Sequence, residues 1–281
     1  MDPHRSGTGC LRHNVRVRKL LIGAGATVTA ILLSAFAVDF GSTVFAEYRL
    51  ARTVRTAAHL DWDPTAVILG FPFIPQAMGQ HYDEVEIKAN DVEHPFVGRA
   101  SLEATMHSVD LTDASWLIRP DADLPVGKLE SRIIIDSAHL GRFMGIKDLV
   151  VEAPARETND ATGGTTESGI SDSQGLVFTG TPVAADFGKR VSVSVDLTIT
   201  GADRATLVFT PTGVLTGAGT ADQNVPDDKL DAVLDAFGAT LPGQKLPFGL
   251  MPTSQGARGS DVIIEGITEN ITVTLQRFRQ S

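Results

Sequence analysis

The sequence predicts an α+β fold in which a mostly antiparallel β-sheet is covered by a few amphipathic helices and preceded by one N-terminal apolar helix. Three observations predict it. An uncharged run near the N-terminus is long enough to cross a membrane, much of the remaining chain alternates apolar and polar residues with the period of a β-strand, and two segments have helical spacing. Antiparallel pairing is favoured over βαβ units because the strand patterns follow one another with turn signals between them.

The uncharged run covers residues 20–38 and follows a basic stretch. A bilayer core needs roughly 20 apolar helical residues, and flanking positive charge stays on the cytoplasmic side. We therefore expect residues 1–19 to form a cytoplasmic tail and residues 39–281 to be exported to the periplasmic side of the inner membrane. Whether the run is a transmembrane anchor or a cleaved signal segment stays open, because Ala35-Phe36-Ala37 has the small-x-small form that a signal peptidase accepts.

Charge is divided unequally between the two sides of this run. Residues 1–19 hold five Lys/Arg and one Asp, or +4, and residues 39–281 hold 19 Lys/Arg against 33 Asp/Glu, or −14. An acidic exported region predicts no nucleic-acid partner, because such binding needs positive surface potential. The single cysteine, Cys10, precedes the run, so the exported region has no disulfide.

Strand patterns dominate the exported region. The clearest is Arg190 to Thr200, where apolar residues at odd positions alternate with polar ones, as in a half-buried antiparallel strand. The same alternation or a short β-rich run occurs at residues 85–89, 102–106, 133–135, 176–179, 205–209, 262–264 and 271–275. These segments predict the sheet.

Helical spacing predicts a helix over Ser42 to His59, continuing out of the uncharged run, and a second over Asp227 to Leu241, with Asp227 as its cap. A short helix is expected at residues 137–144. The Thr-, Ser- and Gly-rich stretch at residues 154–175 cannot bury enough apolar surface to order itself. It is either a disordered loop or a linker, and we favour a loop because similar β-type runs flank it.

Two apolar segments each carry Pro-Phe. Gly70 to Met78 (GFPFIPQAM) and Leu246 to Pro252 (LPFGLMP) both contain a second proline and a glycine and precede a strand that begins with Asp, a weak internal echo. Because proline fits poorly in regular structure, we expect irregular backbone in both. Either they fill the ends of the core, or they rim an apolar opening or touch a membrane surface.

Motifs for catalysis are missing from the sequence. It has no G-x-S-x-G, H-E-x-x-H, C-x-x-C or G-x-x-x-x-G-K motif, and no histidine of the exported region pairs with another histidine or a cysteine at helical or strand spacing. We therefore expect no catalytic residues, no metal site and no cofactor, and hence a protein that is not an enzyme.

These features together resemble a known family. The N-terminal apolar segment, GFPFIPQAMGQHYDEVEI, DDKLDAVLDAFGATLPG and LPFGLMP with DVIIEGITENITVTL are similar to the actinobacterial envelope proteins called mannan chain-length control protein, or lipomannan elongation factor A, over roughly residues 40–278. The resemblance implies binding of phospholipids, including phosphatidylinositol and its relatives, and support of mannan-chain elongation in lipomannan. It also implies a tubular lipid-binding fold, in which a highly curved antiparallel sheet wraps a long amphipathic helix and encloses an apolar groove.

On this interpretation the two Pro-Phe segments and the helix at 227–241 provide the lipid contacts. The expected contact residues are Phe71, Phe73, Ile74, Met78, Phe237, Leu241, Leu246, Phe248, Leu250 and Met251. Lys245 and Arg258 flank the second segment and are candidate partners for a phosphate headgroup. The expected partners are a phospholipid, the inner membrane and a mannosyltransferase. Two alternatives stay open: an envelope scaffold that docks a membrane glycosyltransferase, and an enzyme acting on lipid-linked glycans.

Overall fold

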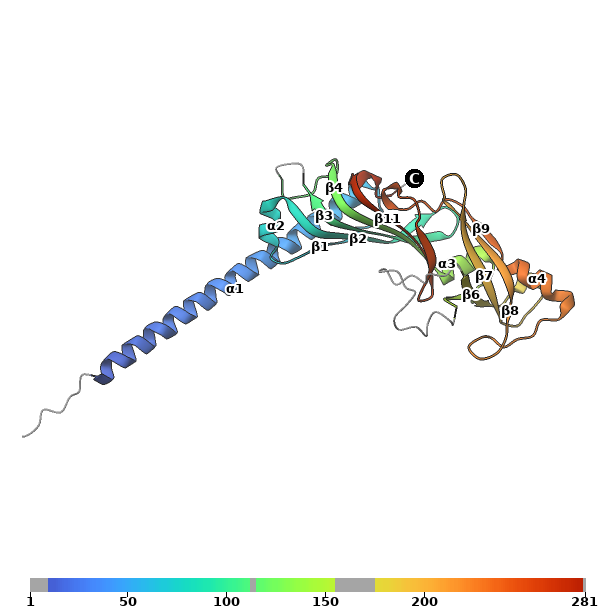
Figure 1. The fold of residues 1–281 in the computed structure, drawn as a ribbon, viewed down its shortest axis with the longest axis horizontal. Coiled ribbons are helices and arrows are strands. Elements are labelled where there is room, and N and C mark those ends of the chain that lie inside the picture. The colour runs from blue at the N-terminus through green and yellow to red at the C-terminus, as the bar shows by residue number, and fades with distance from the viewer. Residues whose placement is uncertain (1–9, 112–114, 155–174, 280–281) are drawn as a thin grey trace, which may run out of the picture.

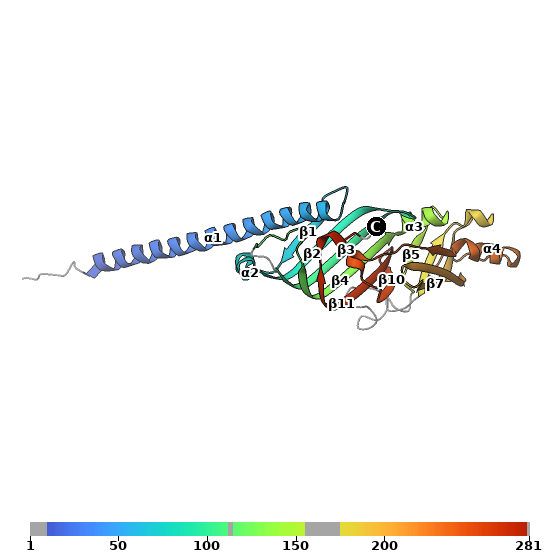
Figure 2. The same cartoon turned by 90° about the horizontal axis from the view of Figure 1, so that it is seen from above.

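The computed structural model describes residues 10–111, 115–154 and 175–279, with the backbone alone for residues 10–21. The molecule is elongated, with helix α1 (Cys10–Ala57) projecting from one end and helix α4 (Asp227–Phe237) at the other (Figures 1 and 2). Two antiparallel sheets lie between them. The stretch Ile22–Ala57 of α1 is long and apolar enough to cross a membrane, and it begins near the N-terminus as either an anchor or a signal segment would.

The strands form one sheet of six and one of five. The first sheet has the order β1-β2-β3-β4-β11-β10 and the second β5-β6-β7-β8-β9. The strands of the first are β1 (Thr65–Leu69), β2 (His81–His94), β3 (Gly98–Asp110), β4 (Leu124–Asp136), β10 (Ser254–Arg258) and β11 (Asp261–Val273). Those of the second are β5 (Val150–Glu152), β6 (Gly175–Gly180), β7 (Val191–Thr200), β8 (Thr206–Leu215) and β9 (Ala239–Leu241).

The antiparallel α+β prediction is confirmed, but the strands divide between two sheets where the sequence suggested one. The division arises because β11 returns late in the chain and pairs along the whole of β4, from Asp261 opposite Asp136 to Val273 opposite Leu124. The segments expected at 262–264 and 271–275 belong to this one strand, apart from Thr274 and Leu275, which are the N-cap and the first residue of the short 3-10 helix η3 (Leu275–Arg277). Within the described residues neither sheet closes on itself.

The helix predictions are confirmed with altered ends. Helix α1 is continuous through the uncharged run, and α3 (Ser137–Met144) lies where a short helix was expected. Helix α4 ends at Phe237 because the chain turns at Gly238 into β9, which pairs with β8. Its N-cap is Pro226, and no side chain caps it, so the expected cap by Asp227 is wrong. Helix α4 covers the second sheet through contacts with β8 and β7.

The expectation of irregular backbone in the first Pro-Phe segment is wrong, because it forms helix α2 (Phe73–Gly79). Its prolines, Pro72 and Pro75, occupy the N-cap and the first turn, where a backbone N–H has no partner within the helix. The Asp39 carboxylate accepts hydrogen bonds from the amides of Phe73 and Ile74 at 3.0 and 2.8 Å. The second segment forms only the short 3-10 helix η2 (Pro247–Gly249).

The inner face of the first sheet is apolar and is covered by three elements far apart in the sequence. Helix α1 buries Ala46, Leu50 and Val54, while η2 and η3 bring Phe248 and Phe278 into edge-to-face contact with ring centroids 5.6 Å apart.

The stretch at 154–175 joins two strands that pair directly, β5 with β6. It therefore connects neighbours within one sheet. The expected disorder concerns residues 155–174, which lie outside the described residues, as do residues 1–9 of the expected cytoplasmic tail.

Candidate functional site

The first sheet has a pocket at the turn between β2 and β3, which we call the hairpin pocket. Its volume is about 340 Å³, within the range of small-molecule sites in proteins. It is lined by Val92, Glu93, His94, Pro95, Ala100, Leu102, Ile133, Gly243, Lys245 and Arg279. The pocket therefore combines the hairpin, β4, the stretch before the second Pro-Phe segment and the C-terminal end of the chain.

The floor of the hairpin pocket is apolar. Ala100 and Leu102 point to the inner face of the sheet because side chains alternate along β3, and Leu102 lies opposite Ile133 of β4. All three side chains are buried in the sheet. A hydrocarbon group bound against them would lose its contact with water without desolvating any charge.

One wall of the pocket is the buried imidazole of His94, at the end of β2. Its Nδ1 accepts hydrogen bonds from the amides of Phe96 and Val97 at 3.3 and 3.4 Å, which leaves Nε2 to carry the proton. Burial lowers the pKa of His94, and a hydrogen bond with the backbone of Gly243 opposes that shift in part. His94 is therefore a neutral group at pH 7 that holds the hairpin turn against the stretch at 243–244.

The rim of the pocket carries two cations, Lys245 and Arg279, and one anion, Glu93. Lys245 is exposed, and Arg279 donates hydrogen bonds to the carbonyls of His59 and Glu93 at 3.1 and 3.4 Å. Through these bonds Arg279 joins the C-terminal end of the chain to the end of α1 and to β2. Positive charge above an apolar floor suits a ligand that has an anionic head and an apolar body.

The lipid-contacting residues expected from the sequence lie in three separate places. In the first Pro-Phe segment Phe73 is buried and stacks on Tyr82, while Phe71, Met78 and, in part, Ile74 face outward.

The second Pro-Phe segment turns inward. Leu246, Phe248 and Leu250 are buried, and the Ser131 hydroxyl of β4 donates to the carbonyl of Pro247 at 2.8 Å. The third group, Phe237 and Leu241, lies in the core of the second sheet, and Met251 is exposed.

The two expected headgroup residues lie on opposite faces of the first sheet. Lys245 lines the hairpin pocket. Arg258, on β10, lies with its Nη2 3.7 Å from the Glu103 carboxylate, and the side chain of Glu103 points away from the pocket floor because it is next in sequence to Leu102. Only Lys245 therefore faces an apolar pocket.

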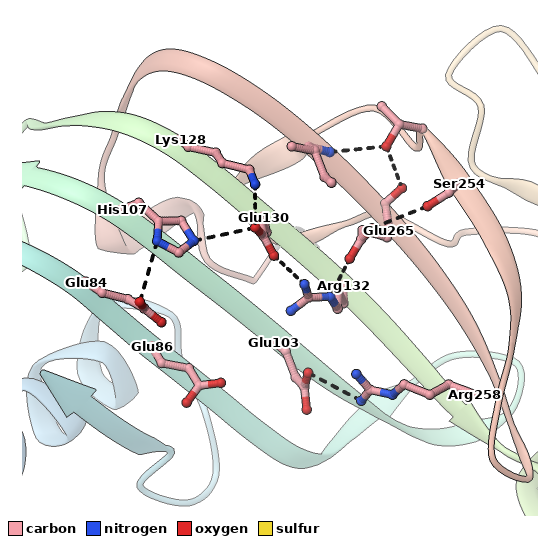
Figure 3. A network of polar contacts seen from close by, with 12 residues as sticks. Glu84, Glu86, Glu103, His107, Lys128, Glu130, Arg132, Ser254, Arg258 and Glu265 are labelled. Carbon is pink, nitrogen blue, oxygen red and sulfur yellow. Dashed lines mark hydrogen bonds and ion pairs between the residues drawn. The ribbon is translucent and has the colours of Figure 1, made fainter. Parts of the chain in front are cut away.

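The outer face of the first sheet carries a network of charged side chains (Figure 3). Arg132 is buried between Glu130 and Glu265, and Lys128 and His107 lie 3.0 and 3.5 Å from Glu130. Burial by itself would raise the pKa of Glu130, but the hydrogen bond from Lys128 and the charge of Arg132 lower it overall. An ionised, paired carboxylate of this kind is poorly suited to proton transfer at neutral pH.

Metal-binding groups are missing from the part of the chain that the structure describes. No set of three or more His, Cys, Asp or Glu side chains in these ranges could hold a metal ion. The hairpin pocket joins an apolar floor to charged groups at its rim, and this combination suits a ligand with a polar head and an apolar body.

Comparison with known families gives the class of protein to which the chain belongs. The model of the LmeA-like phospholipid-binding family matches residues 37–267. This chain belongs to that family. Searches of the curated proteins and of the solved structures each found no match.

The LmeA-like match begins beside the end of the uncharged run and includes both sheets up to the middle of β11. It contains every lining residue of the hairpin pocket except Arg279. Sequence reasoning missed His94 and Arg279 because neither belongs to a motif. The Pro95 turn after β2 was the one local signal for the site, and the contact with residues 243–245 is long-range.

Proposed function

We propose that this LmeA-like protein is a non-enzymatic phospholipid-binding protein that takes the lipid into the hairpin pocket. One observation carries the proposal: in a phospholipid-binding family member, an apolar floor of Ala100, Leu102 and Ile133 lies beneath a rim with Lys245 and Arg279. Acyl chains would lie on the floor, where each buried methylene contributes about 0.8 kcal/mol. The phosphate would lie beside Lys245.

The finer assignments are part of the same proposal. The lipid is of the phosphatidylinositol type, the protein acts on the outer, periplasmic face of the inner membrane, and its binding supports mannan-chain elongation of lipomannan together with a mannosyltransferase. The resemblance to tubular lipid-binding folds supports this proposal, with α1 as the long helix against the inner face of the first sheet.

Photocrosslinking tests the proposal. Full-length protein would be incubated with vesicles that contain a phosphatidylinositol bearing a photoreactive acyl chain, and the labelled peptides would be identified by mass spectrometry. We expect labelling of the peptides that carry Leu102 and Ile133. Lys245→Gln should lower the labelling several-fold, because a charge-assisted hydrogen bond to phosphate is lost.

Arg258→Gln is the matched control, because it removes the same charge from the opposite face of the sheet. Equal loss in both variants, or labelling confined to peptides away from the hairpin pocket, would contradict this site. Turnover of a lipid-linked glycan by the purified protein would contradict the non-enzymatic part of the proposal.

A further inference from the structure

An apolar surface surrounds the base of α1, where the uncharged run meets the folded domain. We call it the anchor-base patch and define it by Phe36, Phe71, Ile74, Met78 and Trp116. Phe71 is 72% exposed and Met78 is 81% exposed, far more than side chains of the core. Contiguous exposed apolar surface of this kind marks contact with another apolar phase or a partner.

The patch is continuous with the uncharged run. Phe71 lies against Phe36, with ring centroids 5.9 Å apart, and Phe36 is within the last turn of that run. Ile74 shares an apolar groove of about 560 Å³ with the run, lined also by Thr27, Ala30, Ile31, Ser34, Ala35 and Val38. The outward side chains of α2 therefore lie at the level of residues that a bilayer would surround.

Asp39 fixes the position of the anchor-base patch along α1 and therefore its depth relative to a bilayer around the uncharged run. Its carboxylate, at the first charged position after the run, is buried and caps α2 through the amides of Phe73 and Ile74. Because a helix rises 1.5 Å per residue, the 19 residues of the run span about 28 Å, close to the thickness of a hydrocarbon core. If the run fills that core, the start of α2 lies at its boundary.

The patch is rigid on its inner side. Phe73 stacks on Tyr82 with centroids 5.8 Å apart, Trp116 packs edge-on against Phe73, and the Tyr82 hydroxyl donates to the carbonyl of Trp116. Burial raises the pKa of Tyr82 to about 12, so this donor keeps its proton at any physiological pH. Trp116 also lies near Phe45, with centroids 6.2 Å apart.

We propose that the anchor-base patch enters the outer boundary of the lipid bilayer beside α1 and gives the domain a second, fixed contact with the membrane. A bilayer is the occupant because the patch continues the surface of the uncharged run, whose residues from Ile22 to Val38 are exposed on all sides of the helix. Trp116 has the position typical of membrane-interface aromatic residues. This inference does not depend on lipid binding in the hairpin pocket.

The two tryptophans of the chain provide the test. Trp116 belongs to the patch, whereas Trp62 follows the far end of α1 and lines a shallow pocket with Asn90, Val92 and Arg279. From Phe45 to Ala57 the helix rises about 18 Å, so the bilayer can reach Trp116 without reaching Trp62. Full-length Trp62→Phe and Trp116→Phe proteins each keep one emitter.

Each protein would be reconstituted into vesicles of phosphatidylcholine that carries bromine near the headgroup end of its acyl chains, and into unbrominated vesicles as a reference. We expect Trp116, observed in Trp62→Phe, to lose most of its emission, and Trp62, observed in Trp116→Phe, to keep most of its own. Adding Phe71→Ser and Met78→Ser should restore part of the Trp116 emission, and the exposed control Met251→Ser should not.

If Trp116 keeps its emission in brominated vesicles into which the chain has inserted, the proposal is wrong, and a protein partner becomes the occupant of the patch. Quenching of Trp62 alone would report lipid near the hairpin pocket and would contradict bilayer contact by the patch. Failure of pocket labelling by photoreactive lipid leaves the quenching result unchanged, so the two proposals are tested separately.

Discussion

The two Pro-Phe segments have similar sequences and both bury the ring of the Pro-Phe pair, Phe73 or Phe248, but they place their other apolar side chains differently. The first forms α2 and turns Phe71 and Met78 outward beside α1, whereas the second forms η2 and buries Leu246 and Phe248 under the first sheet. Their surroundings explain the difference. Asp39 caps the first, and the second lies over Gly266 of β11, which has no side chain to exclude it.

Local composition therefore does not decide whether the apolar side chains of a segment fill a core or face outward. A Cβ on Gly266 would lie 2.6 Å from the carbonyl oxygen of Met251 and 2.7 Å from Cδ1 of Leu246. The space for the second segment is therefore made by a strand that follows it in the chain. The first segment has no comparable cover, because it begins where α1 leaves the domain.

The two segments should differ most in stability when an aromatic ring is removed from each. Phe248→Ala should lower the free energy of unfolding by about 3–5 kcal/mol, because it leaves a cavity in a packed core. Phe71→Ala should change it by less than about 0.5 kcal/mol, since the ring is mostly exposed. Urea unfolding of the full chain in detergent micelles measures both, and equal losses would contradict the assigned burial.

Filling the space under the second segment should cost less. Gly266→Ala is expected to destabilise the protein by about 1–3 kcal/mol, because the added methyl group displaces Leu246 and the backbone at Met251. Gly213→Ala is the matched control in a strand, where a Cβ would meet nothing within 4 Å. A tolerated Gly266→Ala with unchanged unfolding would show that the second segment does not pack on β11.

Removing the cap should release the first segment without unfolding the domain. Asp39→Ala removes the acceptor of the hydrogen bonds from the amides of Phe73 and Ile74, and we expect a local cost of about 0.5–2 kcal/mol. Hydrogen exchange of the α2 amides should become faster while exchange in β11 stays unchanged. Asp63→Ala, at an exposed ion pair with Arg55, is the control and should leave α2 protected.

Acid should loosen the stretch that leads into the second segment, through His94. The pKa of His94 is lower in the folded state than in the unfolded chain, so between these two pKa values the unfolded chain binds more protons. The free energy of unfolding therefore rises with pH across that range. The contribution is complete above the ordinary pKa of about 6.5 and is lost as the pH falls below it. Unfolding of wild type and His94→Gln from pH 7.5 to 5.5 should show a smaller loss in the variant. A parallel loss in both would assign the acid sensitivity to other groups.

The smallest effect on stability is expected at the exposed methionine of each Pro-Phe segment. Met78→Ser and Met251→Ser should each change the free energy of unfolding by less than about 0.5 kcal/mol, because both side chains are largely exposed. The two variants should differ when vesicles that carry the protein are floated in the presence of excess competing lipid. Less Met78→Ser protein should stay with the vesicles, whereas Met251→Ser should be retained like the wild type. Equal retention of the two variants would show that the two segments do not differ in their contact with the membrane.

Period-two alternation and short β-rich runs predicted seven of the eleven described strands, because burial on one face of a sheet is reflected directly in the order of residues, and they missed the short strands β1, β5, β9 and β10. The same reasoning failed at α2, where the prolines were counted against helix although Pro72 and Pro75 occupy positions that lack hydrogen-bond partners. It also extended α4 to Leu241, because an apolar residue in β9 can match helical spacing by chance.

The hairpin pocket could not be predicted in the same way. Its apolar floor was visible as strand alternation in β3 and β4, and Lys245 was identified as a neighbour of the second Pro-Phe segment. His94 and Arg279 were not identified, because their partners at Gly243, His59 and Glu93 are distant in the sequence. Phe237 lies in a segment with helical spacing, and that spacing does not indicate which of the two sheets the helix covers.

The sequence by itself determined the apolar N-terminal helix, the acidic region beyond it, the antiparallel strands and the family resemblance, because hydropathy, charge and residue spacing act locally. The tertiary structure alone showed that β11 returns to β4, that the first Pro-Phe segment exposes Phe71 and Met78 while the second buries Leu246 and Leu250, and that a charged rim lies above an apolar floor. These depend on contacts between residues far apart in the chain, whose pairing follows from how the sheets pack and not from any short stretch of sequence.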